Sequence, residues 1–234
     1  MIPALACSGC ITSAESVLIE QQSSNELRKI FNSKNSDASG GDENVKKIVV
    51  SLQIQPIVSL AHKLNLDVEE TVAKLVTYFK NLGADCVYDL KMAEDIALLE
   101  HQREFLESFR SKKKKPLISS ACPGWICYAE KTHGNWILPH ISRVKSAQQI
   151  MGSLIKSHLC QKWKMPPKSI FHLTLMPCFD KKLEASRGDF YNEAMDAHDV
   201  DMVITTGSLA IFNLISYLFT KCYYIFVLFF LQLK

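Results

Sequence analysis

The chain has 234 residues, of which 47% are hydrophobic, and a formal net charge of +3. This length allows one large domain or two small lobes with a buried core, and so small a charge gives no indication of a nucleic-acid-binding surface. Eight cysteines without a recognisable secretory signal argue against a disulfide framework. They indicate a reducing compartment, the cytosol by default, and a metal or redox role for some of the thiols.

The N-terminal segment, residues 1–31, contains the CxxC pair Cys7 and Cys10 directly ahead of a predicted helix over Thr12–Gln21. A thioredoxin-like dithiol needs a preceding strand, and the chain before Cys7 is too short to form a convincing one. A structural zinc site needs a second CxxC or an HxxxH pair, and none is nearby. Cysteines three apart are also typical of ferredoxin-like clusters, so a partial cluster site is a third interpretation.

A polar stretch over residues 32–44 predicts a flexible linker. Beyond it, β-branched runs and apolar residues at helical spacing predict alternating strands and helices. The predicted elements are strands over Lys47–Leu52 and Ala84–Asp89 and helices over Asp67–Gly83 and Met92–Arg110. Because strand and helix alternate, the predicted fold class is α/β, a parallel sheet flanked by helices.

A basic run, Lys112–Lys115, follows the last of these helices. It resembles a nuclear localisation patch. A solvated loop beside a helix C-terminus, where cations suit the helix dipole, is the interpretation that we favour, because short basic runs are common.

The segment SACPGW contains the first candidate ligand, Cys122. The apolar run Pro116–Ile118 predicts a buried strand ahead of it, and Pro123 suits the first position of a following helix. A sulfur at a strand end and close to the positive pole of a helix favours a thiolate or an anionic cluster that thiolates hold. A buried cysteine is more often a small apolar residue, so the pattern is only suggestive when taken alone.

A second segment, MPCFDKKLEASR, repeats this arrangement 56 residues later. A predicted strand over Phe171–Met176 leads into Cys178, and the charged residues Lys181, Lys182 and Glu184 follow. Between the two cysteine segments, Ser146 and Gln149 predict a capping box at the start of another helix. A further strand is predicted over Val200–Thr205.

The composition changes after Gly207, where 209–231 is an almost continuously apolar run. Such a run is long enough to cross a membrane. Lys221 near its middle would cost about 2.5–3.5 kcal/mol on insertion scales, which weakens that interpretation. We therefore expect a hydrophobic C-terminal tail, residues 208–234, that is foreign to the rest of the fold, with a membrane anchor as the alternative.

Together, SACPGW, MPCFDKKLEASR and DVDMVITTG resemble the iron-only hydrogenase-like proteins of eukaryotes, over roughly residues 4–207. This family comprises the nuclear prelamin A recognition factors and a cytosolic iron–sulfur assembly component. CPGWICYAEKTHG and SAQQIMGSLIK are more similar to the assembly component. The resemblance implies a chain truncated at both ends, with an incomplete hydrogenase-like α/β domain over residues 45–207 and a remnant of an iron–sulfur segment over 1–31.

The resemblance implies a four-iron four-sulfur cluster held by four cysteines, two of which are Cys122 and Cys178. It also implies that Cys7 and Cys10 belong to a second cluster segment, in which the family's preceding cysteine is replaced by Ala4. The remaining two ligands of the first cluster would lie in a downstream segment that this sequence does not contain. Lys181, Lys182 and Glu184 would offset the charge of the cluster and order its loop, with an exposed charged helix start as an equal alternative.

The function that the resemblance implies is delivery of iron–sulfur clusters to cytosolic and nuclear apoproteins, by a carrier that is not an enzyme and that binds other assembly proteins. Hydrogen turnover is disfavoured, because Ala121 stands where iron-only hydrogenases have a proton-donating cysteine. The alternatives are a nuclear prelamin-binding protein and a non-functional or membrane-tethered form. The expected location is the cytosol, with the nucleus as a second location and a membrane only if 209–231 is an anchor.

Overall fold

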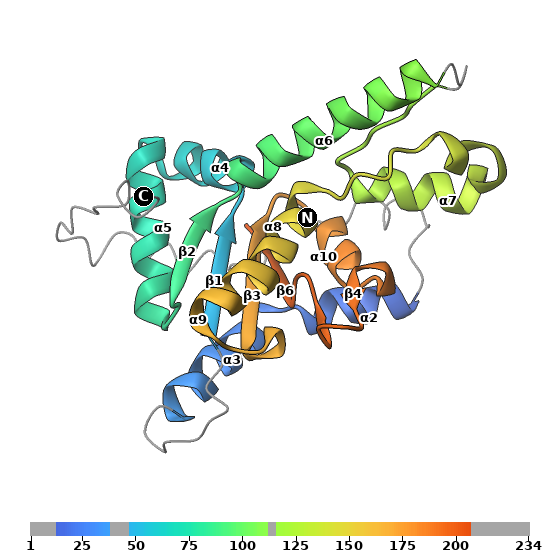
Figure 1. Ribbon diagram of the computed structural model, residues 1–234. Coiled ribbons are helices and arrows are strands. Elements are labelled where there is room, and N and C mark those ends of the chain that lie inside the picture. The colour runs from blue at the N-terminus through green and yellow to red at the C-terminus, as the bar shows by residue number, and fades with distance from the viewer. Residues whose placement is uncertain (1–12, 38–46, 112–115, 207–234) are drawn as a thin grey trace.

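The computed structural model describes residues 13–37, 47–111 and 116–206. Its centre is a parallel four-stranded sheet in the order β2-β1-β3-β6, with helices on both faces (Figure 1). The strands are β1 (Lys47–Leu52), β2 (Cys86–Asp89), β3 (Ile170–Met176) and β6 (Met202–Thr205), and a separate antiparallel pair is β4 (Tyr191–Asn192) with β5 (Ala197–His198). The predicted α/β class with a parallel sheet is therefore confirmed.

The main helices are α2 (Ser13–Gln21), α3 (Ser24–Asp37), α4 (Ile54–Leu64), α5 (Val68–Leu82), α6 (Lys91–Arg110), α7 (Pro123–Ile137), α8 (Ala147–Leu154), α9 (Cys160–Trp163) and α10 (Asp180–Ala185). Shorter helical turns are η1 (Leu138–His140), η2 (Ile155–Leu159), η3 (Pro167–Ser169) and η4 (Gly188–Phe190). Side-chain caps mark the starts of α5 and α8, and the cap predicted at Ser146 is confirmed. The Asp67 carboxylate accepts from the N–H of Glu69, and the Ser146 hydroxyl accepts from the N–H of Gln149.

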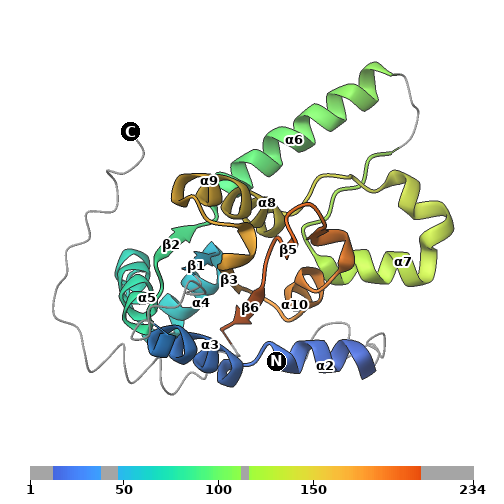
Figure 2. The ribbon, with the colours of Figure 1, turned by 60° about the horizontal axis from the view of Figure 1, so that its bottom comes forward.

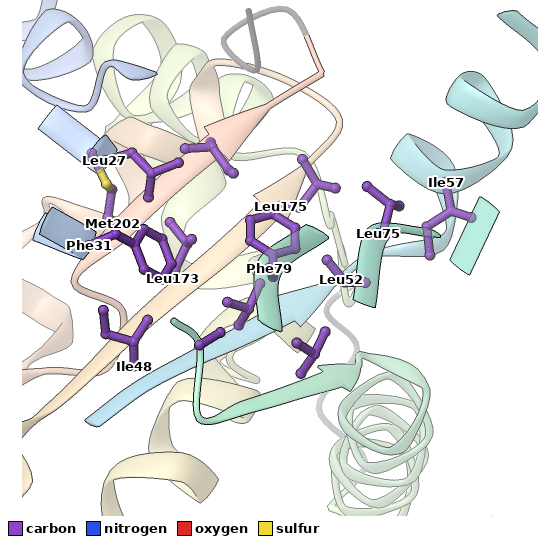
Figure 3. Packing of buried hydrophobic residues seen from close by; sticks show 14 of the residues in the cluster. Leu27, Phe31, Ile48, Leu52, Ile57, Leu75, Phe79, Leu173, Leu175 and Met202 are labelled. Carbon is purple, nitrogen blue, oxygen red and sulfur yellow. The ribbon is translucent and has the colours of Figure 1, made fainter. Parts of the chain in front are cut away.

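One face of the sheet is covered by α3, α4 and α5. Alternate residues of β1, Ile48, Val50 and Leu52, point toward these helices, since side chains alternate between the faces of a strand. Phe31 of α3 and Phe79 of α5 fill the same layer (Figure 3). This layer is the larger apolar core of the protein.

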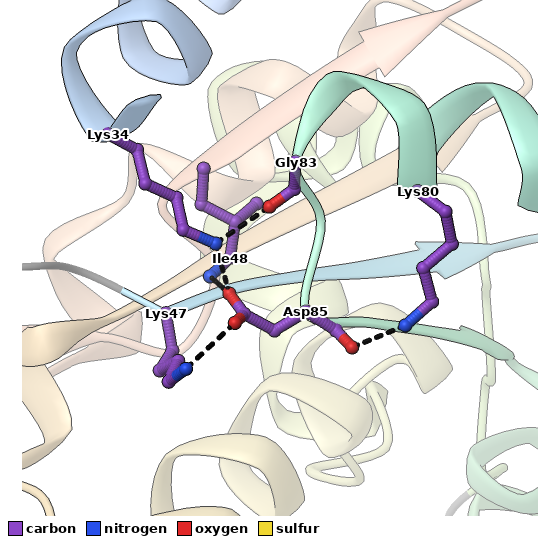
Figure 4. A network of polar contacts seen from close by, with 6 residues as sticks. All are labelled: Lys34, Lys47, Ile48, Lys80, Gly83 and Asp85. Atoms are coloured by element: carbon purple, nitrogen blue, oxygen red, sulfur yellow. Dashed lines mark hydrogen bonds and ion pairs between the residues drawn. The ribbon is translucent and has the colours of Figure 1, made fainter. Parts of the chain in front are cut away.

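A polar network fastens α3 and the end of α5 to this sheet (Figure 4). The Asp85 carboxylate accepts from Lys34 at 2.5 Å, from Lys47 at 2.9 Å and from the N–H of Ile48 at 2.8 Å. Lys34 also donates to the carbonyl of Gly83 at 2.7 Å. These donors and cations hold the pKa of Asp85 below its usual range, although burial acts in the opposite direction.

Residues 32–37, which the sequence placed in the polar linker, instead continue α3. Lys34 lies in these last turns, so the contact with Asp85 supplies a tertiary partner that local composition does not reveal. Residues 38–44 of the predicted linker lie outside the described residues, as do Lys112–Lys115, Cys7, Cys10 and the hydrophobic tail. Within the described ranges, no helix combines the length and apolar character needed to cross a membrane.

The second face of the sheet packs against α6, α8, η2, α9 and α10. Met151 of α8, Ile155 of η2 and Val203 of β6 belong to this apolar layer. The predicted helix α6 is present and extends well beyond the sheet (Figure 1). Its predicted apolar face is not buried by the described residues, and Leu99 and Phe109 are 62% and 74% exposed.

A buried histidine lies in the middle of β3, on the second face. His172 Nδ1 is 3.0 Å from the carbonyl oxygen of Asp199, and its Nε2 is 2.9 Å from the hydroxyl of Ser51. The carbonyl can only accept, so Nδ1 donates and Nε2 accepts from Ser51. Burial lowers the pKa of His172 to about 3, and the charge of Lys156 acts in the same direction, while the bond to Asp199 opposes them.

We expect acid to destabilise the fold through this histidine. An unfolded chain protonates it near pH 6.5, whereas the folded chain resists protonation down to about pH 3. The contribution of His172 to the free energy of unfolding is complete above pH 6.5. It falls by about 1.4 kcal/mol per pH unit as the pH drops toward 3. Urea unfolding from pH 7 to pH 4 measures the slope. His172→Gln should flatten it, and the exposed His158→Gln should not; equal slopes in the two variants would contradict this origin.

Candidate metal centre

Cys122 lies immediately before α7, as the residue that caps this helix, and Pro123 occupies its first turn. The prediction for Pro123 is thus confirmed. The Cys122 side chain is exposed and makes no capping hydrogen bond, while its N–H donates to the Ser120 hydroxyl at 3.2 Å. The thiol is held at the positive end of α7 and is free to meet a partner.

The prediction of a buried strand over Pro116–Ile118, ahead of Cys122, is wrong. Pro116 is exposed, and Ile118 makes only a single isolated bridge to Ile141 outside the main sheet. The run is therefore an extended connection whose backbone bonds to the segment after α7. A short apolar run does not distinguish a buried strand from an extended connection.

Cys178 lies between β3 and α10 and is half-buried. Its sulfur accepts from the backbone N–H groups of Asp180 and Lys181, which begin α10. Burial raises the pKa of the Cys178 thiol and the Asp180 charge adds to this, whereas the two N–H groups and the Lys181 charge oppose it. The thiol is therefore neutral near pH 7 unless a cation takes its proton's place.

The first turns of α7 and α10 meet, which brings the two cysteine segments together (Figure 2). A Cβ atom on Gly124 would lie 2.7 Å from Asp180 Oδ2 and 3.6 Å from Cys122 Sγ. Glycine has no Cβ and so keeps this space open, and the Asp180 carboxylate and the Cys122 sulfur both border it. Arg187, just after α10, binds Glu130 of α7 through two bonds of 2.8 and 2.9 Å and holds the two segments together.

Lys181 and Glu184 are buried, so the alternative of an exposed charged helix start is not what the structure has. They form an ion pair of 2.6 Å with each other. Glu184 also accepts from the hydroxyl of Ser146, and the Gln148 amide donates to the carbonyl of Lys181 at 3.2 Å. These bonds fix α10 against the start of α8.

Lys182 is also buried and connects α10 to the N-terminal helices. Its ammonium donates to the carbonyl of Gln22 at 2.6 Å and lies 5.0 Å from the centre of the Phe179 ring. Burial lowers the pKa of Lys182 to about 8. The Gln22 amide donates back to the Lys182 carbonyl, and its oxygen accepts from the N–H of Val203. Gln22 was missed by sequence reasoning, since a glutamine between two helices carries no local signal.

The described residues contain no group of three or more histidine, cysteine or acidic side chains already gathered as a metal site. Cys122 and Cys178 both lie beside the contact between α7 and α10. The other two predicted ligands, Cys7 and Cys10, fall outside the described residues. The two predicted ligands of the first cluster therefore lie in segments whose helices are in contact.

An open pocket of about 510 Å³ lies elsewhere, between α6 and α8. It contains none of the predicted site residues. Arg103 in its wall is paired with Glu100 at 3.2 Å and with Glu107 at 3.7 Å. Because this pocket contains none of the predicted site residues, the cysteines remain the better candidate site.

Comparisons with known proteins identify the family of this chain. The model of the family described as "Iron only hydrogenase large subunit, C-terminal domain" matches residues 46–216. Probable cytosolic Fe-S cluster assembly factors of Drosophila willistoni and Drosophila virilis are 55% and 54% identical to this chain over 203 residues. Each match covers 86% of this chain and 43% of the relative, so the chain spans less than half the length of these relatives.

Solved structures lead to the same family. The apo form of an FeFe-hydrogenase from Chlamydomonas reinhardtii aligns with a TM-score of 0.66 and 30% identity, over 72% of this chain and 43% of that one. A structure of FeFe-hydrogenase concerned with its inactivation by oxygen aligns with the same TM-score and 29% identity. Because the family match extends over most of the sequence, this protein belongs to the iron-only hydrogenase-like family.

Proposed function

We propose that the protein carries an iron–sulfur cluster and helps to transfer it to cytosolic and nuclear apoproteins. The observation that carries this proposal is the meeting of α7 and α10, which places Cys122 and Cys178 at adjoining helix N-termini. Thiolates are the usual ligands of such clusters, and backbone N–H groups at helix starts stabilise their negative charge. A four-iron four-sulfur cluster is the form that four cysteine ligands would hold.

The buried residues of α10 support this assignment. Lys181 and Lys182 bring positive charge into the turn that follows Cys178, where an anionic cluster would need it. Glu184 balances Lys181 and binds Ser146, so the turn is fixed before any ligand arrives. Fixed ligands lower the cost of organising a site.

A carrier accounts for the residues better than an enzyme that turns over hydrogen. Ala121, next to Cys122, has no group that can give or take a proton, and a proton donor beside the metal is what that reaction needs. The hydrogenase-like fold itself does not decide between these roles, because one fold serves many functions. The names of the Drosophila relatives favour cluster assembly and a cytosolic location. Its partners would be other assembly proteins and the apoproteins that receive clusters.

Anaerobic reconstitution with iron and sulfide tests the proposal. We expect about four irons per cluster and an absorbance band from thiolate-to-iron charge transfer. The double substitution of Cys122→Ala and Cys178→Ala should remove nearly all bound iron. The matched control replaces Cys86 and Cys127, two half-buried cysteines, with alanine and should retain the iron. Unchanged iron in the first double variant would overturn the assignment.

A further inference from the structure

Helix α6 carries large apolar side chains that the described residues leave in contact with water. Five of them are between 47% and 74% exposed, namely Leu98, Leu99, Phe105, Leu106 and Phe109. At 3.6 residues per turn these five positions, the α6 stripe, fall on one side of the helix. The rings of Phe105 and Phe109 stack with their centres 6.2 Å apart. A contiguous apolar surface of this kind marks a binding face, whereas scattered apolar residues do not.

The opposite side of α6 is already used by the fold. Ala93 belongs to the apolar layer on the second face of the sheet. Glu104 accepts from the hydroxyl of Ser142 and from the N–H of Arg143, the latter at 3.1 Å. These contacts fix the rotation of the helix about its axis, so α6 cannot turn to bury the stripe against the described residues. The α6 stripe therefore needs a partner from elsewhere.

The sequence supplies an apolar segment of matching length. Residues 209–231 lie outside the described ranges, and their only charged side chain is Lys221. As a helix this segment would be about 35 Å long, and α6, with 20 residues, is about 30 Å long. One chain thus has an apolar helix face without a partner and an apolar segment long enough to cover it.

The path of the chain brings this segment to α6. Because the sheet is parallel, β6 ends at Thr205 at the same edge where β2 leads through Leu90 into α6. The outer strands β2 and β6 are three strand spacings apart, about 14 Å. The chain from Thr205 to residue 209 spans up to about 14 Å, and α6 leans from β2 toward the side of β6 and α7 (Figure 1). The segment therefore begins within reach of the base of α6.

We propose that residues 209–231 fold back onto α6 and cover the α6 stripe within the same chain. The inference concerns a surface away from the cysteines and does not depend on the proposed function. Contact removes apolar surface of both partners from water, which is favourable in proportion to the area buried. The short connection after Thr205 makes the contact intramolecular and gives it a high effective concentration.

The competing occupants are a second copy of the chain on the stripe and a bilayer around the segment. A second copy must overcome the effective concentration of the attached segment. A bilayer must take in Lys221 near the middle of the apolar run, which is costly. On the surface of α6 the same lysine can extend its ammonium into water while its apolar stem stays in contact. The attached segment on α6 is therefore the favoured arrangement.

Photo-crosslinking of the full chain tests this contact. Phe105→p-benzoylphenylalanine places a photoreactive ketone in the α6 stripe. Irradiation at low micromolar concentration should join it to a peptide from 209–231 in a product of monomer mass. Tyr191→p-benzoylphenylalanine, at an exposed position on β4, is the matched control and should not form this product. A covalent dimer would show a second copy on the stripe and overturn the proposal, as would failure to capture the segment.

Phosphatidylcholine vesicles added before irradiation separate the contact from a membrane anchor. Under the proposal the chain stays out of the vesicle fraction and the crosslink to 209–231 persists. If the chain floats with the vesicles and the crosslink disappears, the segment prefers the bilayer and the proposal is overturned.

Leu99→Asp gives a second measurement that needs no photoreactive group. In a covered stripe it places a charge inside an apolar contact and should lower the thermal midpoint by roughly 4–8 °C. Val58→Asp on α4 controls for the lower helix propensity of aspartate, because Val58 is also exposed and lies outside the stripe. It should shift the midpoint by less than about 2 °C. Equal shifts in the two variants would show that the α6 stripe is open to water and would overturn the proposal.

Discussion

Replacing Gly152 by alanine is expected to destabilise the fold by about 3 kcal/mol or more. A Cβ atom there would lie 2.3 Å from the carbonyl oxygen of Asp199 and 2.6 Å from its carbonyl carbon. These are backbone atoms, and the oxygen is also bonded to His172, so it cannot move without breaking a buried contact. Helix α8 would therefore have to move away from the connection between β5 and β6.

Urea unfolding at pH 7 measures this cost. Gly188→Ala is the matched control, because a Cβ atom at that position meets nothing within 4 Å, and it should change the free energy of unfolding by less than about 0.5 kcal/mol. A Gly152→Ala protein as stable as the Gly188→Ala protein would show that α8 does not pack on Asp199 as described.

The second large effect is expected at Lys156, which lies in η2 and is 1% exposed. Its ammonium donates to the Asp201 carboxylate at 2.7 Å and to the carbonyl oxygens of Pro167 and Ile170. Lys156→Met keeps the length of the side chain but leaves these acceptors without their donor. We expect a loss of about 2–4 kcal/mol, reduced somewhat because Asp201 is partly exposed and keeps its bond from the N–H of His172.

An exposed ion pair on the same protein is the control for Lys156. Lys168 and Asp196 are 3.6 Å apart with both side chains about two-thirds exposed, so Lys168→Met should cost less than about 0.5 kcal/mol. Thermal unfolding of both variants gives the comparison. Lys156→Asn would be too short to reach the acceptors and should be no better than Lys156→Met; near-equal stability of the Lys156 and Lys168 variants would contradict the buried network.

Local chemistry made several elements predictable. The run Lys47–Leu52 coincides with β1, because β-branched residues in a buried strand leave a clear pattern. Asp67, Ser146 and Pro123 mark helix starts through hydrogen bonds or backbone angles that act within one turn. Such signals are contained in a few neighbouring residues and do not depend on the rest of the fold.

Features that depend on distant partners were not predictable. Lys182 and Gln22 meet across 160 positions of sequence, so neither segment alone reveals that both are buried. For the same reason the sequence does not distinguish burial from exposure of Lys181 and Glu184. The burial of Asp180 has no local signal either, because one more acid in a charged segment is ordinary.

The order of the sheet also has a consequence for how the protein is made. Strand β1 can pair with β2 soon after synthesis, but its other edge pairs with β3, more than a hundred residues further along the chain. At about 5–20 residues per second, that edge stays open for several seconds after β2 has left the ribosome. An unpaired edge of apolar residues readily joins other chains. The newly made protein should therefore depend on chaperones until β3 arrives to close the gap.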